Sequence, residues 1–173
     1  MEVQFTKGLK RYRGWLLLLL LLAVCWGLVQ LVLRATAEYP ALGEPVSYPV
    51  NQLDGFALSI EEPTWSPFRG YTLRYDVEIH SEDVYTLSNE AAPMERLEAL
   101  KDGQWYALAR QWESFNPISF DLGGAENTGF EGSLVQKYDD YGTRLEPGTY
   151  RLTLELADRQ GAPHYLAAEF TVE

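Results

Sequence analysis

Three pairs of neighbouring carboxylates come closest, by residue type and spacing, to an acid–base site. They are Glu61-Glu62, Glu82-Asp83 and Asp139-Asp140. Hydrolysis of a glycosidic bond needs two carboxylates held at a fixed separation across a cleft, and the short strands expected around these pairs offer little cleft. Calcium takes oxygen ligands on loops and fits such pairs better, although Asp139-Asp140 lacks the spacing of a helix–loop–helix calcium site. We therefore expect no catalytic pair, and calcium binding remains an open alternative.

Few side chains in the sequence suit nucleophilic catalysis or metal binding. The two histidines, His80 and His164, fall on the polar side of one expected strand and at the start of another, so we expect both to face solvent. The sequence contains no Gly-x-Ser-x-Gly or Ser-x-x-Lys motif and no phosphate-binding or dinucleotide-binding fingerprint. The one cysteine, Cys25, lies in an apolar run, so no disulfide can form within the chain and no zinc ligand cluster is present. We expect no catalytic residue, no metal site and no cofactor, and hence a protein that is not an enzyme.

Exposed tryptophans are the remaining candidates for ligand contact. Trp65 and Trp112 lie in expected loops, where binding residues often occur, and their rings could stack on a sugar. Either residue could instead cap the end of a sheet. Trp105 lies in an expected strand, and we expect it in the core.

Charge is divided unevenly along the chain. Residues 1–14 carry four Lys or Arg residues against one Glu, whereas residues 38–173 carry nine Lys or Arg residues against 24 Asp or Glu, a net charge of −15. Phosphate backbones would repel such a domain, so nucleic acid is excluded as a partner, and we expect anionic lipid headgroups to repel it as well.

The apolar run at residues 15–33, WLLLLLLLAVCWGLVQLVL, has no charged side chain. As a helix it would rise about 28 Å, enough to cross the hydrocarbon core of a bilayer. Four basic residues precede the run and only Arg34 follows closely, so the positive-inside bias places residues 1–14 in the cytoplasm as a short basic tail. We expect a transmembrane helix over residues 15–34, with the remainder extracytoplasmic.

Two other fates of the apolar run stay open. Ala-Thr-Ala at residues 35–37 has the pattern of a signal-peptidase site, and cleavage near Ala37 would secrete the rest of the chain. Leu-Ala-Val-Cys at residues 22–25 is similar to a lipoprotein signal, although Val24 is bulkier than the usual small residue before the cysteine. All three fates export the domain.

Beyond the run, the sequence predicts a tether and then a series of short strands. Residues 35–54 contain Pro40, Pro45 and Pro49, a composition typical of an extended tether. Alternation and turn residues then predict strands and, at Asp102-Gly103, a hairpin in preference to a helix over 93–109. Segments 63–70 and 125–132 are expected to be loops. The expected strands are 56–62, 71–80, 83–88, 96–100, 104–108, 114–124, 133–138, 149–157 and 164–173.

The stretch LEPGTYRLTLEL at residues 145–156 predicts the corner of a β-sandwich. Pro147 fixes the backbone and Gly148 permits a tight change of direction, while Leu145 plugs the end of the core. Tyr150 can bury its ring between two sheets and return its hydroxyl to an upstream backbone group, as in a tyrosine corner. We expect all four residues to be structural.

The ordered set around that corner resembles a family of bacterial immunoglobulin-like domains found in exported, membrane-tethered or lipid-anchored proteins of Gram-positive bacteria. The residues that carry the resemblance are Leu97-Glu98, Asp102-Gly103, Trp105, Tyr141-Gly142, Leu145-x-Pro147-Gly148-x-Tyr150-Arg151 and Glu169-Phe170. It covers residues 55–173, and it departs from the family in NEAAPMERLE at residues 89–98, which lacks the Tyr-Gly usually found before the Leu-Glu strand. The resemblance implies an immunoglobulin-like antiparallel β-sandwich and a place in the cell envelope, and it implies no reaction.

These observations predict a membrane-anchored extracytoplasmic domain that acts as a non-catalytic binding module. The membrane is contacted by residues 15–33, and the partner is expected to be another envelope protein or a cell-wall component. Two alternatives remain: a sensory or regulatory ectodomain of a membrane complex, and a carbohydrate-binding or adhesive domain. The sequence identifies no small-molecule ligand and no oligomeric state.

Overall fold

The chain forms two units in the computed structural model, which describes residues 3–88, 93–110, 118–124 and 127–173. The first unit is Met1–Ala37 and the second is Glu38–Glu173. The folded unit therefore begins at residue 38, earlier than the boundary at residue 55 expected from composition.

The first unit consists of one helix, α1 (Val3–Ala35). Its segment Gly14–Leu33 is long and apolar enough to cross a membrane, and none of it is buried within the protein. A helix that is hydrophobic on all sides needs an apolar environment other than water. A signal sequence near the N-terminus meets the same criteria of length and composition, so α1 fits a membrane span and a signal sequence equally.

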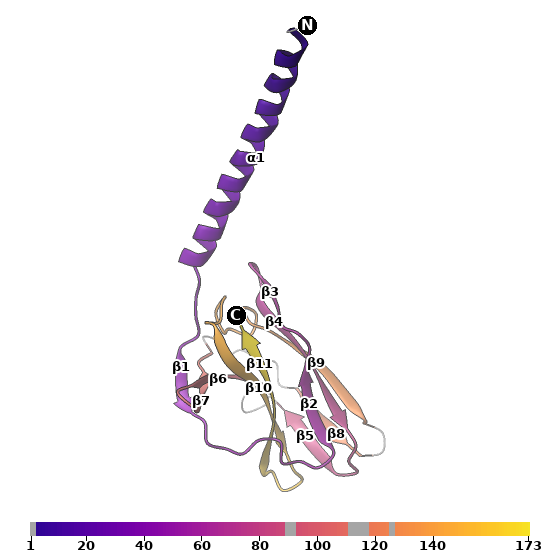
Figure 1. The fold of residues 1–173 in the computed structure, drawn as a ribbon. Helices are drawn as coiled ribbons and strands as arrows, with labels where there is room; N and C mark the ends of the chain where they lie inside the picture. The colour runs from indigo at the N-terminus through magenta and orange to yellow at the C-terminus, as the bar shows by residue number, and fades with distance from the viewer. Residues whose placement is uncertain (1–2, 89–92, 111–117, 125–126) are drawn as a thin grey trace. The chain divides into compact units, whose positions relative to one another are not determined.

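The second unit is mostly β and contains two antiparallel sheets, which Figure 1 displays as two layers. Within the described residues the larger sheet has the order β1-β7-β6-β10-β5-β8, with β11 on the opposite edge of β10. The smaller sheet has the order β2-β4-β3, and β9 pairs with the other edge of β4. The strands are β1 (Leu42–Pro45), β2 (Phe56–Ile60), β3 (Thr64–Ser66), β4 (Gly70–Ile79), β5 (Val84–Ser88), β6 (Glu95–Lys101), β7 (Gln104–Leu108), β8 (Ser119–Gly123), β9 (Gly129–Val135), β10 (Gly148–Ala157) and β11 (Pro163–Val172).

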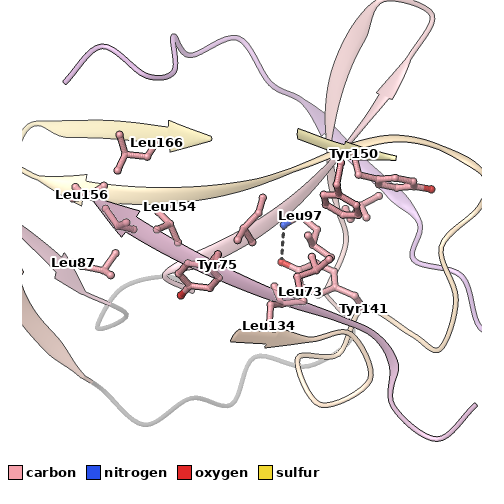
Figure 2. Close-up of a cluster of buried hydrophobic side chains, with 14 of the residues drawn as sticks. Leu73, Tyr75, Leu87, Leu97, Leu134, Tyr141, Tyr150, Leu154, Leu156 and Leu166 are labelled. Carbon is pink, nitrogen blue, oxygen red and sulfur yellow. Dashed lines mark hydrogen bonds between the residues drawn. The ribbon is translucent and has the colours of Figure 1, made fainter. Parts of the chain in front are cut away.

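Alternating apolar residues build the core between the sheets. In β4, the side chains of Leu73, Tyr75, Val77 and Ile79 are buried, while the residues between them point to the other face. The facing residues of β10 are leucines, and Figure 2 displays them packed with leucines of neighbouring strands. Full burial of one such side chain contributes about 1.5–3 kcal/mol. The leucines that are at most 1% exposed are Leu73, Leu87, Leu97, Leu134, Leu152, Leu154, Leu156 and Leu166.

The expected hairpin between residues 93 and 109 is confirmed. Strands β6 and β7 pair with Lys101 opposite Gln104, which leaves a two-residue turn. Both turn residues have positive φ, 50° at Asp102 and 79° at Gly103, the geometry that favours Asp-Gly in such hairpins.

Two segments expected to be loops contain strand residues. Residues 64–66 form β3 against β4, and β9 begins at Gly129, where the sequence predicted a strand only from residue 133. Gly132 lies opposite Tyr75 in the sheet, and a Cβ atom there would lie 2.2 Å from the Tyr75 hydroxyl oxygen. Glycine at position 132 therefore leaves room for the Tyr75 ring. Composition alone does not distinguish a glycine in this role from a glycine in a loop.

The segment expected to be a tether is bound to the sandwich. Strand β1 pairs with β7, and the amide of Val46 donates a hydrogen bond to the carbonyl of Trp105 at 2.8 Å. Residues 46–53, which we call the strap, then lie against the larger sheet, where the Tyr48 ring stacks on Tyr165 with 3.7 Å between centroids. Proline is compatible with an edge strand, because no ladder donor is needed there, so a proline-rich composition fits a bound strap as well as a free tether.

Tyr150 has the burial and the upstream hydrogen bond that a tyrosine corner predicts. Tyr150 is buried, its hydroxyl donates to the carbonyl of Glu146 at 2.7 Å, and Leu145 is buried beside it. The role expected for Gly148 differs, since its φ is not positive and it already pairs with Val172 as the first residue of β10. A Cβ atom at Gly148 would meet only the Tyr150 ring, at 3.9 Å.

We predict that the corner depends on Tyr150 and not on Gly148. Tyr150→Phe should lower the free energy of unfolding by about 1 kcal/mol, because it removes one hydrogen bond, and Tyr150→Ala should lower it by about 3–5 kcal/mol, because it empties a core site. Gly148→Ala is the matched control and should change the free energy of unfolding little. The measurement is urea-induced unfolding of the sandwich in the full chain, and a Gly148→Ala cost as large as that of Tyr150→Ala would contradict this account.

Candidate functional site

The point where the folded unit begins is fixed by backbone hydrogen bonds. The carbonyl of Glu38 accepts from the amides of Thr143 at 2.8 Å and Arg144 at 3.1 Å, and the amide of Glu38 donates to Thr143 Oγ1 at 3.0 Å. Gly142 has φ of 73°, and a Cβ atom there would lie 2.5 Å from the Glu38 carbonyl oxygen. We call Glu38, Gly142, Thr143 and Arg144 the clamp. It explains the Tyr141-Gly142 pair physically, because only glycine permits this approach.

The helical hydrogen bonding of α1 continues to residue 36. The amide and the hydroxyl of Thr36 both donate to the carbonyl of Val32 at 2.9 Å, so residue 36 is still bonded to the last turn of α1. Ala37 is therefore the one residue between helix-bonded and sandwich-bonded backbone.

Trp65 lies on β3, opposite Tyr71 in the register of the smaller sheet. Its side chain is 36% exposed, and the Arg144 guanidinium covers its ring at 4.8 Å from the centroid. This cation–π contact joins Trp65 to the clamp and occupies one face of the indole. Trp112, the second candidate, lies outside the described residues.

A buried polar network lies beneath the strap, where sequence reasoning predicted only a strand. Glu98 is fully buried on the face of the larger sheet that points away from the core, and it accepts from Arg151 Nε at 2.5 Å and from the Tyr48 hydroxyl. The Arg151 guanidinium also covers Trp105 at 4.4 Å from the ring centroid, so Trp105 is half-buried on this outer face and not in the core as expected. Burial and the neighbouring Glu98 raise the pKa of the Tyr48 hydroxyl.

A second polar cluster lies between the sheets. The Tyr75 hydroxyl donates a hydrogen bond to the Glu95 carboxylate at 2.8 Å. The Arg110 guanidinium donates to the backbone carbonyl of Asp139 at 2.8 Å and to the Asp139 carboxylate at 3.3 Å. Burial raises the pKa of both the Glu95 and the Asp139 carboxyl, against the lowering effect of these hydrogen bonds and of Arg110. Asp139 also accepts from the amide of Val135 at 2.6 Å, so both of its carboxylate oxygens are occupied by protein donors.

The residues weighed as catalytic or metal-binding do not converge. His80 is exposed, with Glu78 as its nearest carboxylate at 4.0 Å, while His164 contacts Asp158 at 3.5 Å on another strand end. Among the described residues no group of three or more His, Cys, Asp and Glu side chains is arranged to hold a metal ion.

Two hollows lie on the surface of the sandwich unit. One, of about 290 Å³, lies beside the corner between the segment 39–42 and strands β6 and β10. The other, of about 590 Å³, is a shallow groove on the outer face of the smaller sheet. Its charged side chains are mostly acidic, and it is lined by Ser59, Glu61, Arg74, Tyr75, Asp76, Glu131, Gly132 and Ser133.

Comparison with known proteins finds no family model that matches this sequence and no curated protein with significant similarity to it. The resemblance to bacterial immunoglobulin-like domains therefore remains a prediction that rests on the sequence.

We predict that Glu95 makes folding stability fall as pH rises. Because its pKa is raised above 4.5 in the folded state, the native protein keeps a proton that the unfolded chain releases. The associated stability is complete below pH 4.5 and is lost as pH rises through the native pKa of Glu95. The unfolding free energy of Glu95→Gln, relative to that of the unsubstituted protein, should thus increase with pH.

The control for this prediction is Glu169→Gln, on the exposed face of β11. Urea unfolding between about pH 4 and pH 8 measures the difference. A difference for Glu95→Gln that stays constant over this range would show that Glu95 has no shifted titration.

Proposed function

We propose that this chain is a single-pass membrane protein whose extracytoplasmic sandwich acts as a non-catalytic binding module for another component of the cell envelope. The observation that carries the proposal is the direct connection of an exposed apolar helix to a folded β unit through Ala37. A folded unit attached to a bilayer by so short a connection meets neighbouring membrane components at high effective concentration, so weak contacts suffice.

The partner is best accommodated on the outer face of the smaller sheet. The outer face of the larger sheet is covered in part by the strap, which buries Glu98 and Arg151. The groove on the smaller sheet is open, and Asp76 and Glu131 make it acidic apart from Arg74. We therefore expect a partner that presents a basic, polar segment to this groove.

We further propose that the sandwich is immunoglobulin-like and related to the exported bacterial domains that it resembles. Two antiparallel sheets and the Tyr150 corner support this assignment. The adhesive alternative has less support, because Arg144 occupies one face of the Trp65 ring that would have to stack on a sugar.

The proposed topology is tested by thiol labelling. In a Cys25→Ser background, Ser59→Cys in the groove should react with a membrane-impermeant maleimide in intact, wall-stripped cells, because residue 59 is exposed and extracytoplasmic. Lys7→Cys should react only after lysis. Reaction of residue 59 only after lysis would refute the topology, and release of the labelled domain into the medium would indicate cleavage near Ala37.

The same Ser59→Cys protein tests the binding face. A photo-crosslinker attached at residue 59 should give one discrete adduct in cells, and the matched variant Thr171→Cys, on the exposed outer face of β11, should not. Charge reversal at Asp76 and Glu131 should abolish the adduct. Equal adducts from both positions, or an adduct indifferent to charge reversal, would refute this face as the site.

A further inference from the structure

The hairpin between β3 and β4 ends in an exposed aromatic and basic tip. Phe68, at the turn, is 79% exposed, the highest value of any described large hydrophobic side chain in the sandwich unit. Tyr138, the next highest at 66%, comes from a different segment. The two segments meet because the amide of Lys137 donates to the carbonyl of Arg69 at 3.1 Å. We call Pro67, Phe68, Arg69, Lys137 and Tyr138 the tip.

The backbone beneath the tip is held firmly by Gln136, which is fully buried. Its side chain accepts from the amide of Tyr71 at 3.0 Å and donates to the carbonyl of Tyr141 at 3.0 Å. Gly70, with φ of 70°, fits against it, since a Cβ atom there would lie 2.7 Å from Gln136 Oε1. The fold therefore holds an apolar side chain out in solvent on an ordered support, which is typical of an interaction surface.

The tip lies at the same end of the sandwich as the clamp. Gly70 also approaches the carbonyl of Thr143, which would lie 3.1 Å from a Cβ atom at that position. Thr143 in turn binds Glu38, where the chain joins the sandwich unit. If α1 spans a membrane, as we propose above, the bilayer surface lies within reach of this end.

The charge of the tip is opposite to that of the unit that carries it. Residues 38–173 have a net charge of −15, yet the tip contains Arg69 and Lys137 and no acidic residue. Anionic headgroups repel the acidic remainder of the unit and attract the basic tip. Both effects favour an orientation in which the tip faces the membrane. Aromatic side chains flanked by basic ones are the combination that lipid headgroup regions accommodate.

We propose that the tip docks into the headgroup region of the membrane that holds α1, with Phe68 and Tyr138 in the interface and Arg69 and Lys137 at the lipid phosphates. The docking rests on the proposed anchor and goes beyond it, because it fixes which end of the sandwich faces the bilayer. It differs from the expectation that anionic lipid repels the whole domain, because it assigns attraction to the tip alone. Anchoring through α1 supplies the high local concentration that makes so small a contact sufficient.

The test uses the full chain with Cys25→Ser, reconstituted into vesicles of phosphatidylcholine and phosphatidylglycerol that contain spin-labelled lipid. An environment-sensitive fluorophore on Tyr138→Cys should be strongly quenched. The control position is Gln160→Cys in the turn between β10 and β11, beyond the end of β10 that lies away from the corner, and it should not be quenched. Both positions are exposed, so the fold should tolerate the labels.

Two changes distinguish docking from mere proximity. With the label at residue 138, Phe68→Ser should remove most of the quenching, and so should replacement of phosphatidylglycerol by phosphatidylcholine, because the first removes the inserted ring and the second the charge attraction. Equal quenching at residues 138 and 160, or a shielded label at 138 that lipid does not quench, would overturn the proposal, the latter in favour of a protein contact. Flotation of the chain with vesicles at alkaline pH checks the membrane insertion of α1 separately. A chain that does not float would refute the proposed anchor and leave the docking of the tip to be judged by the quenching data.

Discussion

The backbone clamp at Glu38 is the constraint on which the rest of this molecule depends. Main-chain groups and the Thr143 hydroxyl form it, and Gly142 permits it because its missing side chain leaves room for the Glu38 carbonyl. Tyr141 supports the clamp from inside, since its buried hydroxyl accepts from the amide of Leu97 at 3.3 Å, as Figure 2 displays. The clamp fixes the point at which the chain enters the sandwich unit.

The strap likewise binds residues that precede the first core strand to the larger sheet. Glu98 and Arg151 would be costly to bury singly, and removal of one partner from such a pair typically costs about 3–5 kcal/mol. Here Tyr48 from the strap completes the hydrogen bonding of Glu98, and Trp105 covers the Arg151 guanidinium. The strap is therefore a structural part of the sheet face, and the outer face of the smaller sheet is left as the more open of the two.

Features set by local sequence were predictable, and features set by distant contacts were not. The alternation of β4 and β10, the Asp102-Gly103 turn and the Tyr150 corner each follow from neighbouring residues. The binding of residues 38–53 to the sandwich was missed because their prolines suit a tether and an edge strand equally, and β9 was placed late because Gly132 is explained only by Tyr75 on another strand. The two segments of the tip meet through a backbone hydrogen bond from Lys137 to Arg69, almost seventy residues apart, for which the sequence has no local signal.

Hydrogen exchange of the full chain in lipid nanodiscs tests most directly whether residues 38–53 belong to the folded unit. The amides of Val46 and Asn51 donate to carbonyls of the larger sheet, and those of Thr143 and Arg144 donate to Glu38. This account predicts that peptides covering residues 38–53 exchange as slowly as those covering β6 and β10. Exchange of residues 38–53 at the rate of an unstructured peptide, while β6 and β10 remain protected, would contradict it.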